Sequence, residues 1–125
     1  MKAVDTNVLA RFLLNDDPAQ TEMARDIIEA GVFVPITVLL ELGWLLQSHY
    51  GFDRSYLTAA LGALLDIPTI MMADEEEVRQ ALAAFAKRGD FADHIHLVAA
   101  KGAEAFVTFD QRMIGTAGMA VEVVQ

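Results

Sequence analysis

Short apolar runs alternate along this chain with longer stretches in which apolar residues recur every three to four positions. A short apolar run is typical of a buried strand, and the longer period is that of one helix face. The runs predict strands at residues 3–4, 32–34, 69–72, 105–109 and 120–124. The longer stretches predict helices at residues 6–14, 18–30, 36–46, 54–65, 75–88 and 91–99. Strands that alternate with helices indicate βαβ units, so we expect an α/β fold with a mostly parallel sheet.

Residues that favour helix ends mark several of these boundaries. Pro18 follows an aspartate and is well suited to a first helical position. Asp53 is placed to cap the fourth helix, and Gly31 is the candidate C-cap of the second. Asp90 and Asp93 are three residues apart, as in a capping box, although the second acid is usually Glu or Gln. The acidic run at residues 74–77 is most simply a first helical turn that matches the helix dipole.

The composition predicts one domain that spans residues 1–125, with no linker or internal repeat to divide it. A hydrophobic fraction of 54% is somewhat high for a chain of this size, which suggests that apolar surface is buried against a partner. There is no cysteine, so a disulfide or a thiolate metal site is excluded. The N-terminus does not resemble a signal peptide and no apolar run could span a bilayer, so we expect a soluble cytoplasmic protein with no membrane contact.

The charge balance is acidic. Nine basic and eighteen acidic residues give a formal net charge of −9, which argues against a broad basic face for nucleic acid. A nucleic-acid substrate would therefore have to be bound through a local patch or through a cation. Solubility alone explains most of the acids.

Four acids are expected to meet at one edge of the predicted sheet. Asp5 and Asp110 follow strands, Asp93 lies in the first turn of a helix, and Glu41 lies just over a turn into another. Carboxylates that close together repel each other, and oxygen-only ligands favour Mg²⁺ or Mn²⁺. Two alternatives remain open: Asp5 acts only as a helix cap, and Glu41 faces water on a narrow polar stripe with Thr37 instead of lying in the interior.

Other chemistries have less support in the sequence. Ser48 and Ser55 are the only serines, and neither lies in a Gly-x-Ser-x-Gly turn. His94 and His96 are two positions apart on a predicted helix, so they cannot chelate one ion together. His96 shares more of the face of Asp93 than His94 does, and it is either a residue that supports Asp93 or a core histidine.

The chain resembles the PIN-domain nucleases, and most closely the ribonuclease toxins of VapBC-type toxin–antitoxin pairs. The resemblance covers essentially the whole chain and rests on the segments Asp5-Thr6-Asn7, Glu41 within an apolar helix, residues 90–97 (DFADHIHL) and residues 106–110 (FVTFD). It implies a three-layer fold in which a mostly parallel five-stranded sheet, in the order 3-2-1-4-5, is flanked by helices.

The resemblance also implies an activity: a Mg²⁺- or Mn²⁺-dependent endoribonuclease that cuts single-stranded or loop RNA. It assigns catalysis and metal binding to Asp5, Glu41, Asp93 and Asp110, with the hydroxyls of Thr6 and Thr108 in support. Asp90 is an additional acid near this set, and it either caps the helix or orders metal-bound water. Arg112 is a candidate phosphate contact, with an ion pair to a surface acid as the equal alternative, and Arg11 is a similar case.

The same resemblance implies a cognate antitoxin as a partner, together with homodimers or hetero-oligomers. Trp44, Leu45, Leu46 and Tyr50 could contact an antitoxin, although core packing explains them equally well. Two rival interpretations stay open. The chain could be a PIN-domain nuclease for RNA processing or for DNA without an antitoxin, or it could be a non-catalytic binding module in which the acids only cap helices.

Overall fold

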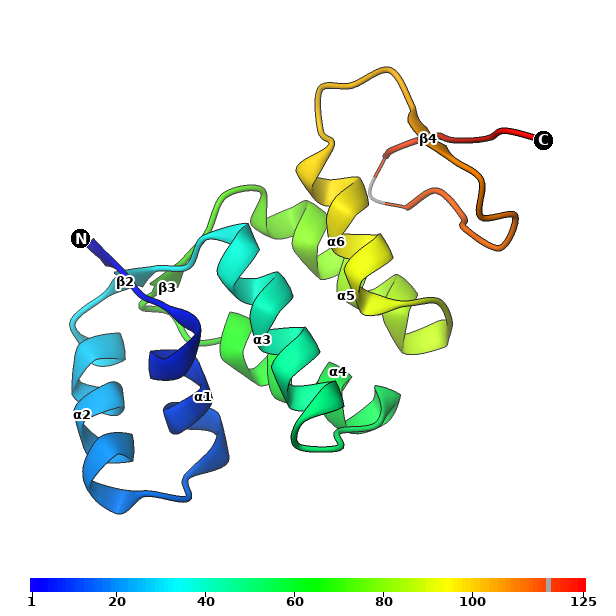
Figure 1. Ribbon diagram of the computed structural model, residues 1–125. Coiled ribbons are helices and arrows are strands. Elements are labelled where there is room, and N and C mark those ends of the chain that lie inside the picture. Colours follow the sequence, from blue (N-terminus) through cyan, green and yellow to red (C-terminus); the bar gives the residue numbers. More distant parts are fainter. Residues whose placement is uncertain (117) are drawn as a thin grey trace. The chain divides into compact units, whose positions relative to one another are not determined.

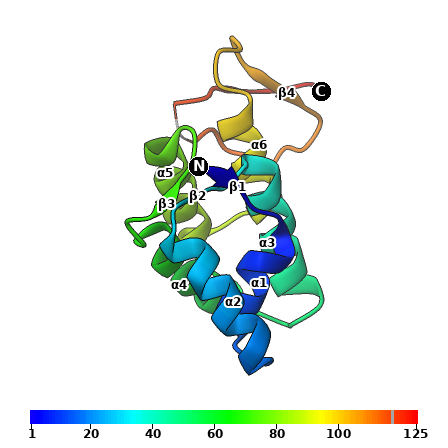
Figure 2. The ribbon, with the colours of Figure 1, turned by 90° about the vertical axis from the view of Figure 1, so that its left-hand side faces the viewer.

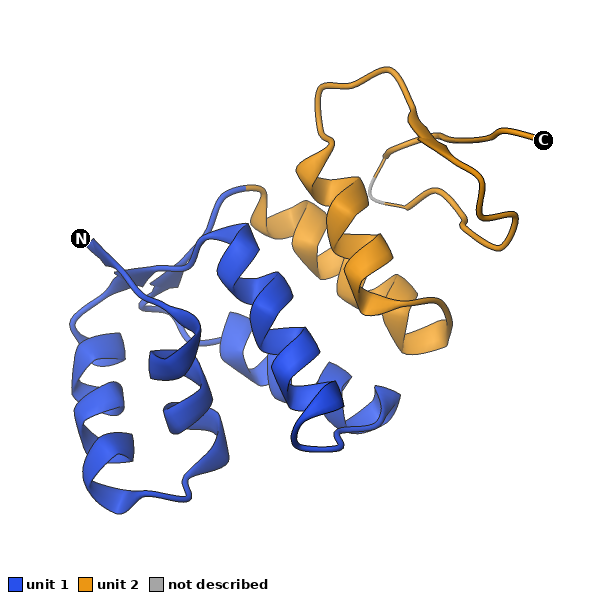
Figure 3. Cartoon of the chain, in the orientation of Figure 1, with its two compact units in different colours: residues 1–73 blue, residues 74–125 orange. Residues whose placement is uncertain are grey.

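The computed structural model describes residues 1–116 and 118–125 and divides into two compact units, Met1–Ala73 and Asp74–Gln125 (Figure 3). We call them unit 1 and unit 2. The single domain expected over residues 1–125 stays a prediction.

Unit 1 contains a parallel three-stranded sheet in the order β1-β2-β3 (Figure 2). Its strands are β1 (Lys2–Ala3), β2 (Val32–Phe33) and β3 (Ile70–Met71). Backbone bonds extend the pairing by one residue, from Val4 N to Phe33 O at 3.2 Å and from Val34 N to Met71 O at 2.8 Å. The first strand is therefore one residue earlier than expected. Val4 is nevertheless buried, and it leads directly into Asp5.

Four helices accompany this sheet: α1 (Thr6–Leu14), α2 (Pro18–Glu29), α3 (Ile36–Ser48) and α4 (Arg54–Leu65). Helices α1 and α2 lie side by side in both ribbon views (Figures 1 and 2). Asp53 caps α4 as predicted, because its side chain accepts from Tyr56 N at 2.7 Å. Helices α1, α3 and α4 bury leucines in the core: Leu9, Leu39, Leu42, Leu46, Leu57, Leu61 and Leu64.

Unit 2 contains α5 (Glu75–Lys87), α6 (Phe91–Ala99), β4 (Phe106–Thr108) and β5 (Val121–Val123). The two strands pair in parallel, and α5 packs on α6. The rings of Phe85 and Phe91 meet edge to face with centroids 5.4 Å apart. Lys101 binds the start of α5 through Asp74 at 2.8 Å and Glu77 at 2.9 Å.

The α/β class and the parallel pairing are confirmed. All five expected strands and all six expected helices are present among the described residues, and no end differs from the expected position by more than two residues. Strands three, two and one adjoin as expected, and so do strands four and five, but the pairing of β1 with β4 in the full order stays a prediction. In the part of the chain that the structure describes, no helix is both long enough and apolar enough to cross a bilayer.

Candidate functional site

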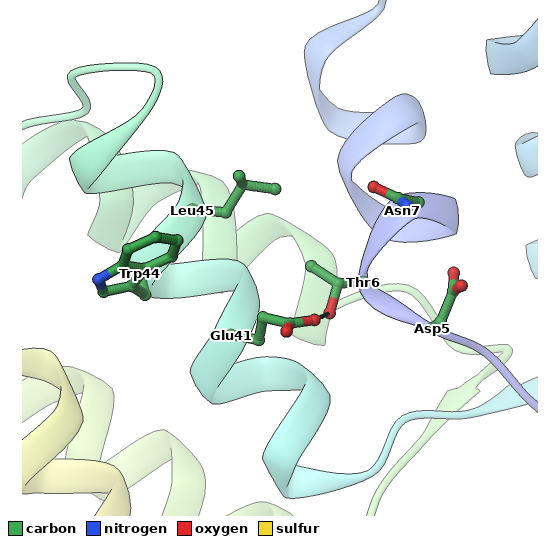
Figure 4. Close-up of a pocket in the computed structure, with 6 residues that line it drawn as sticks. All are labelled: Asp5, Thr6, Asn7, Glu41, Trp44 and Leu45. Atoms are coloured by element: carbon green, nitrogen blue, oxygen red, sulfur yellow. Dashed lines mark hydrogen bonds between the residues drawn. The ribbon is translucent and has the colours of Figure 1, made fainter.

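A pocket of about 270 Å³ lies in unit 1, where the start of α1 faces the middle of α3 (Figure 4). Helix α1 packs on α3, the two helices bury Leu9 and Leu42 respectively, and this packing brings the two segments together. The pocket is lined by Asp5, Thr6, Asn7, Glu41, Trp44 and Leu45. The structure thus brings two of the four predicted acids to one cavity, although they are 36 positions apart in sequence.

Asp5 both caps α1 and lines the pocket. Its backbone is extended, as at most N-caps, and its Oδ1 accepts from Val8 N at 3.2 Å. Its Oδ2 makes no hydrogen bond within the described residues. In Figure 4 the side chain turns away from Thr6 and Glu41. Because one oxygen serves as the cap and the other is free, the two roles considered for Asp5 are compatible.

Glu41 is held by a hydroxyl of the neighbouring helix. The side chain of Thr6 is buried, and its Oγ1 donates to Glu41 Oε1 (Figure 4). Glu41 itself is exposed, and so is Thr37 one turn earlier. The prediction that Glu41 lies in the interior was therefore wrong, and the alternative, a polar stripe that faces water, is correct. Water at this face removes most of the desolvation cost of the charge, while Thr6 restricts the side chain to one orientation.

Asp93 lies in the first turn of α6 in unit 2, among other acids. Burial raises the pKa of its carboxyl, and the negative charges of Asp90 and Asp110 raise the pKa further. The nearby His96 and His94 act in the opposite direction, with smaller effects. These acids therefore interact electrostatically within unit 2, and neutralisation by a proton or a cation would relieve their repulsion.

Asp110 is fixed at the end of β4 by its neighbours. Its Oδ1 accepts from Arg112 N at 2.9 Å and from Arg112 Nε at 3.2 Å, and these bonds lower the pKa of the carboxyl. Its own N–H donates to Thr108 Oγ1 at 3.0 Å. Thr108 therefore shapes this turn. Arg112 forms the ion pair that was the alternative to a phosphate contact, and Arg11 likewise pairs with Asp16 at 3.1 Å.

Asp90 occupies the N-cap position of α6, but its side chain makes no capping hydrogen bond. The predicted capping box is therefore not formed. His94 is buried: its Nε2 donates to Arg88 O at 2.8 Å, and Thr116 Oγ1 lies 3.4 Å from its Nδ1. It is a core histidine, whereas His96 is exposed, so a core role for His96 was wrong.

The donor chemistry of these acids fits a hard divalent cation, because the available ligands are carboxylate and hydroxyl oxygens. Asp5 and Glu41 belong to unit 1, and Asp93 and Asp110 belong to unit 2. Among the described residues of each unit, no group of three His, Cys, Asp or Glu side chains could hold a metal ion. A ligand set that combines all four acids stays a prediction.

The sequence did not single out Asn7 and Trp44 as pocket residues. Trp44 is 66% exposed, so core packing does not explain it, whereas Leu46 is fully buried and does belong to the core. Positions 37, 41, 44 and 48 are all exposed and recur at the spacing of one helix face. That spacing could have placed Trp44 beside Glu41 from the sequence.

Comparison with known proteins adds two findings. The family model described as "PIN domain" matches residues 2–119. A curated relative named "VapC ribonuclease", from Aquifex aeolicus (strain VF5), is 28% identical over 120 residues, and the match covers 90% of this chain and 89% of the relative. No solved structure gave a significant match.

Proposed function

This chain belongs to the PIN-domain family, and from that premise we propose that it is a Mg²⁺- or Mn²⁺-dependent endoribonuclease, the toxin of a VapBC-type pair. The observation that carries the proposal is the pocket of unit 1, where Asp5 and a hydroxyl-oriented Glu41 line one cavity. The name of the Aquifex relative supports RNA as the substrate.

In this proposal Glu41 orients the attacking water and takes its proton. Thr6 holds the Glu41 side chain, so the basic oxygen does not have to be ordered during the reaction. Because Glu41 is exposed, a water molecule can reach it without a large rearrangement. The water then displaces one oxygen of the phosphodiester in line, and the leaving oxygen takes up a proton from solvent.

Asp5, Asp93 and Asp110, together with Glu41, are the proposed ligands of the cation. A bound divalent ion supplies Lewis-acid stabilisation of the charge that develops on the phosphate. Arg112 orients the Asp110 carboxylate, while the Thr108 hydroxyl accepts from the backbone N–H of Asp110 and fixes the turn. Burial is the main cause of the raised pKa of Asp93, but the negative charges of Asp90 and Asp110 also contribute to it, and their repulsion supports a cation there.

Cleavage of RNA by wild type and by the Asp5→Asn and Glu41→Gln variants, with and without EDTA, tests the proposal. We expect EDTA to abolish cleavage and each substitution to slow it by about 10²- to 10⁴-fold. Asp53→Asn is the matched control, since Asp53 also caps a helix but lies outside the pocket. Undiminished, EDTA-sensitive cleavage by Asp5→Asn would remove Asp5 from the mechanism.

The toxin role has its own test. Expression of the wild-type chain should arrest cell growth, expression of Glu41→Gln should not, and co-expression of a small neighbouring reading frame should restore growth. Metal-dependent cleavage without growth arrest would instead favour a nuclease that works without an antitoxin. Absence of both cleavage and cation uptake would favour a binding module.

A further inference from the structure

We propose that Trp44 binds substrate by stacking its indole on a base next to the scissile phosphate. This inference rests on the proposed nuclease function and assigns a role to a side chain that the acidic residues do not explain. Trp44 lines the same pocket as Asp5 and Glu41 (Figure 4).

The exposure of the indole is the first argument. Trp44 is 66% exposed, although the neighbouring Leu42 and Leu46 on α3 are fully buried. Among the described residues no aromatic ring packs against it, whereas the rings of Phe52 and Tyr56 in the same unit pack against each other. The largest aromatic surface at the pocket is therefore free to receive a planar ligand.

The position of Trp44 relative to Glu41 is the second argument. The two residues are three apart on α3, and side chains at this spacing leave the helix about 5–6 Å apart on neighbouring parts of its surface. A nucleotide has a charged phosphate at one end and a flat base at the other. With the phosphate at the carboxylates and their cation, the base of the same or the adjacent nucleotide falls within reach of the indole.

The charge of the pocket is the third argument. Its described lining contains neither Lys nor Arg, and the chain as a whole carries a formal net charge of −9. Affinity for RNA therefore has to come largely from contacts other than phosphate pairing. Stacking provides such affinity for any base, at an energy that corresponds to about tenfold or more in binding per base.

A protein interface is the competing explanation for an exposed tryptophan. The centre of such an interface is usually formed by several apolar side chains together. The pocket offers only Trp44 and the half-buried Leu45 beside two acids, and exposed Met23 and Ile27 lie on α2 outside its lining. This mixed lining is better matched to a nucleotide than to an apolar peptide.

The sequence makes a direct test possible, because Trp44 is the only tryptophan in the chain. A short mixed-sequence single-stranded RNA is titrated into the Glu41→Gln variant with Mg²⁺, so that cleavage does not compete with binding. We expect saturable quenching of the tryptophan emission, and much less quenching with the same RNA in a duplex, where the bases are already stacked.

Substitutions then measure the contribution of the ring. In the otherwise wild-type chain, Trp44→Leu should raise KM about tenfold with kcat within about twofold, and Trp44→Phe should give a smaller rise. Tyr56→Leu is the matched control, since Tyr56 is 64% exposed but does not line the pocket. Circular dichroism verifies that each variant is folded.

Several results would overturn the inference. They are the absence of saturable quenching, an unchanged KM in Trp44→Leu, or a change of oligomeric state in Trp44→Leu on gel filtration while RNA affinity is unchanged. Failure of the nuclease proposal would give a different result. If the wild-type chain cuts no RNA but RNA still quenches Trp44 emission in a saturable way, the proposed activity is wrong and the stacking contact stands.

Discussion

The hydrogen bond from Thr6 to Glu41 joins a buried hydroxyl to an exposed carboxylate across 35 positions of sequence. An exposed glutamate on a helix ordinarily samples several rotamers, and fixing such a side chain costs conformational entropy. The buried threonine, whose own position is set by the start of α1, offsets that cost before substrate binds. Thr6 is therefore a positioning residue that acts through Glu41.

Thr6→Val tests this role. The change keeps the shape of the side chain and removes its hydroxyl, so we expect kcat for RNA cleavage to fall about tenfold with little change in KM. Thr6→Ser keeps the hydroxyl and should retain most of the activity. Steady-state kinetics on one RNA substrate measures both variants, and equal losses in the two would argue that packing of Thr6, not its hydrogen bond, is what matters.

Asp93 is expected to cost stability at neutral pH. Its pKa is raised in the folded state, so between its ordinary pKa and the raised value the folded protein binds more protons than the unfolded chain. The free energy of unfolding therefore falls as pH rises through this window. Asp93→Asn should raise Tm by a few degrees at pH 7, a small effect because solvent partly screens the group.

The advantage of Asp93→Asn should vanish in acid, below the ordinary pKa of aspartate, where the wild-type carboxyl is also neutral. Thermal unfolding across pH, without divalent ions, provides the measurement. Asp26→Asn, at an exposed acid of α2, is the control and should show no such pattern. A Tm for Asp93→Asn below that of wild type at pH 7 would contradict the electrostatic argument.

The turn between α5 and α6 depends on close contact of a glycine with a histidine. Gly89 has a φ of +91°, and a Cβ built there would lie 2.7 Å from His94 Nε2. His94 in turn donates to the carbonyl of Arg88, which ends α5. The sequence predicted helices at residues 75–88 and 91–99, on either side of this glycine. It did not indicate that the histidine occupies the space a side chain would need.

Gly89→Ala should therefore destabilise the protein by two separate effects, an unfavourable backbone conformation and overpacking against His94. Gly102→Ala is a matched control, because its φ is +97° and nothing lies within 4 Å of the added methyl group. We expect a loss of about 1 kcal/mol for Gly102→Ala, and at least about 1 kcal/mol more for Gly89→Ala. Urea denaturation would measure both, and equal losses would show that the contact with His94 is unimportant.

The two units each supply half of the proposed acidic set, and this has a measurable consequence for the whole molecule. If Asp5 of unit 1 and Asp93 of unit 2 hold the same cation, either substitution alone should abolish its uptake. An ion that binds only the folded state stabilises it, by about 2.7 kcal/mol when its concentration is 100 times its Kd.

We therefore expect Mn²⁺ to raise the Tm of wild type and of Asp53→Asn, but not that of Asp5→Asn or Asp93→Asn. Isothermal titration should show the same pattern of uptake. Uptake that is lost in one variant and intact in the other would confine the ion to a single unit. The proposal that four acids form one site would then be wrong.

Much of the fold and part of the site could be predicted from sequence. The α/β class, the helices and several of their caps follow from apolar spacing and from residues such as Asp53, because these rules act between neighbours three or four positions apart. Asp5 at the end of a strand and Asp93 in a first helical turn follow in the same way. The exposure of Glu41 and Trp44 could not be predicted from the sequence, because α3 is apolar on most of its surface and no single face stands out as the buried one.

What the sequence by itself determined is the series of helices and strands and the candidate acids at their ends, since both are local properties of the chain. Only the tertiary structure decided that Thr6 reaches Glu41, that Trp44 is exposed beside them, that Arg112 pairs with Asp110 and that His94 fills the space over Gly89. Those outcomes depend on which helix faces pack and how far each side chain extends. Packing selects them among many arrangements that share the same local pattern.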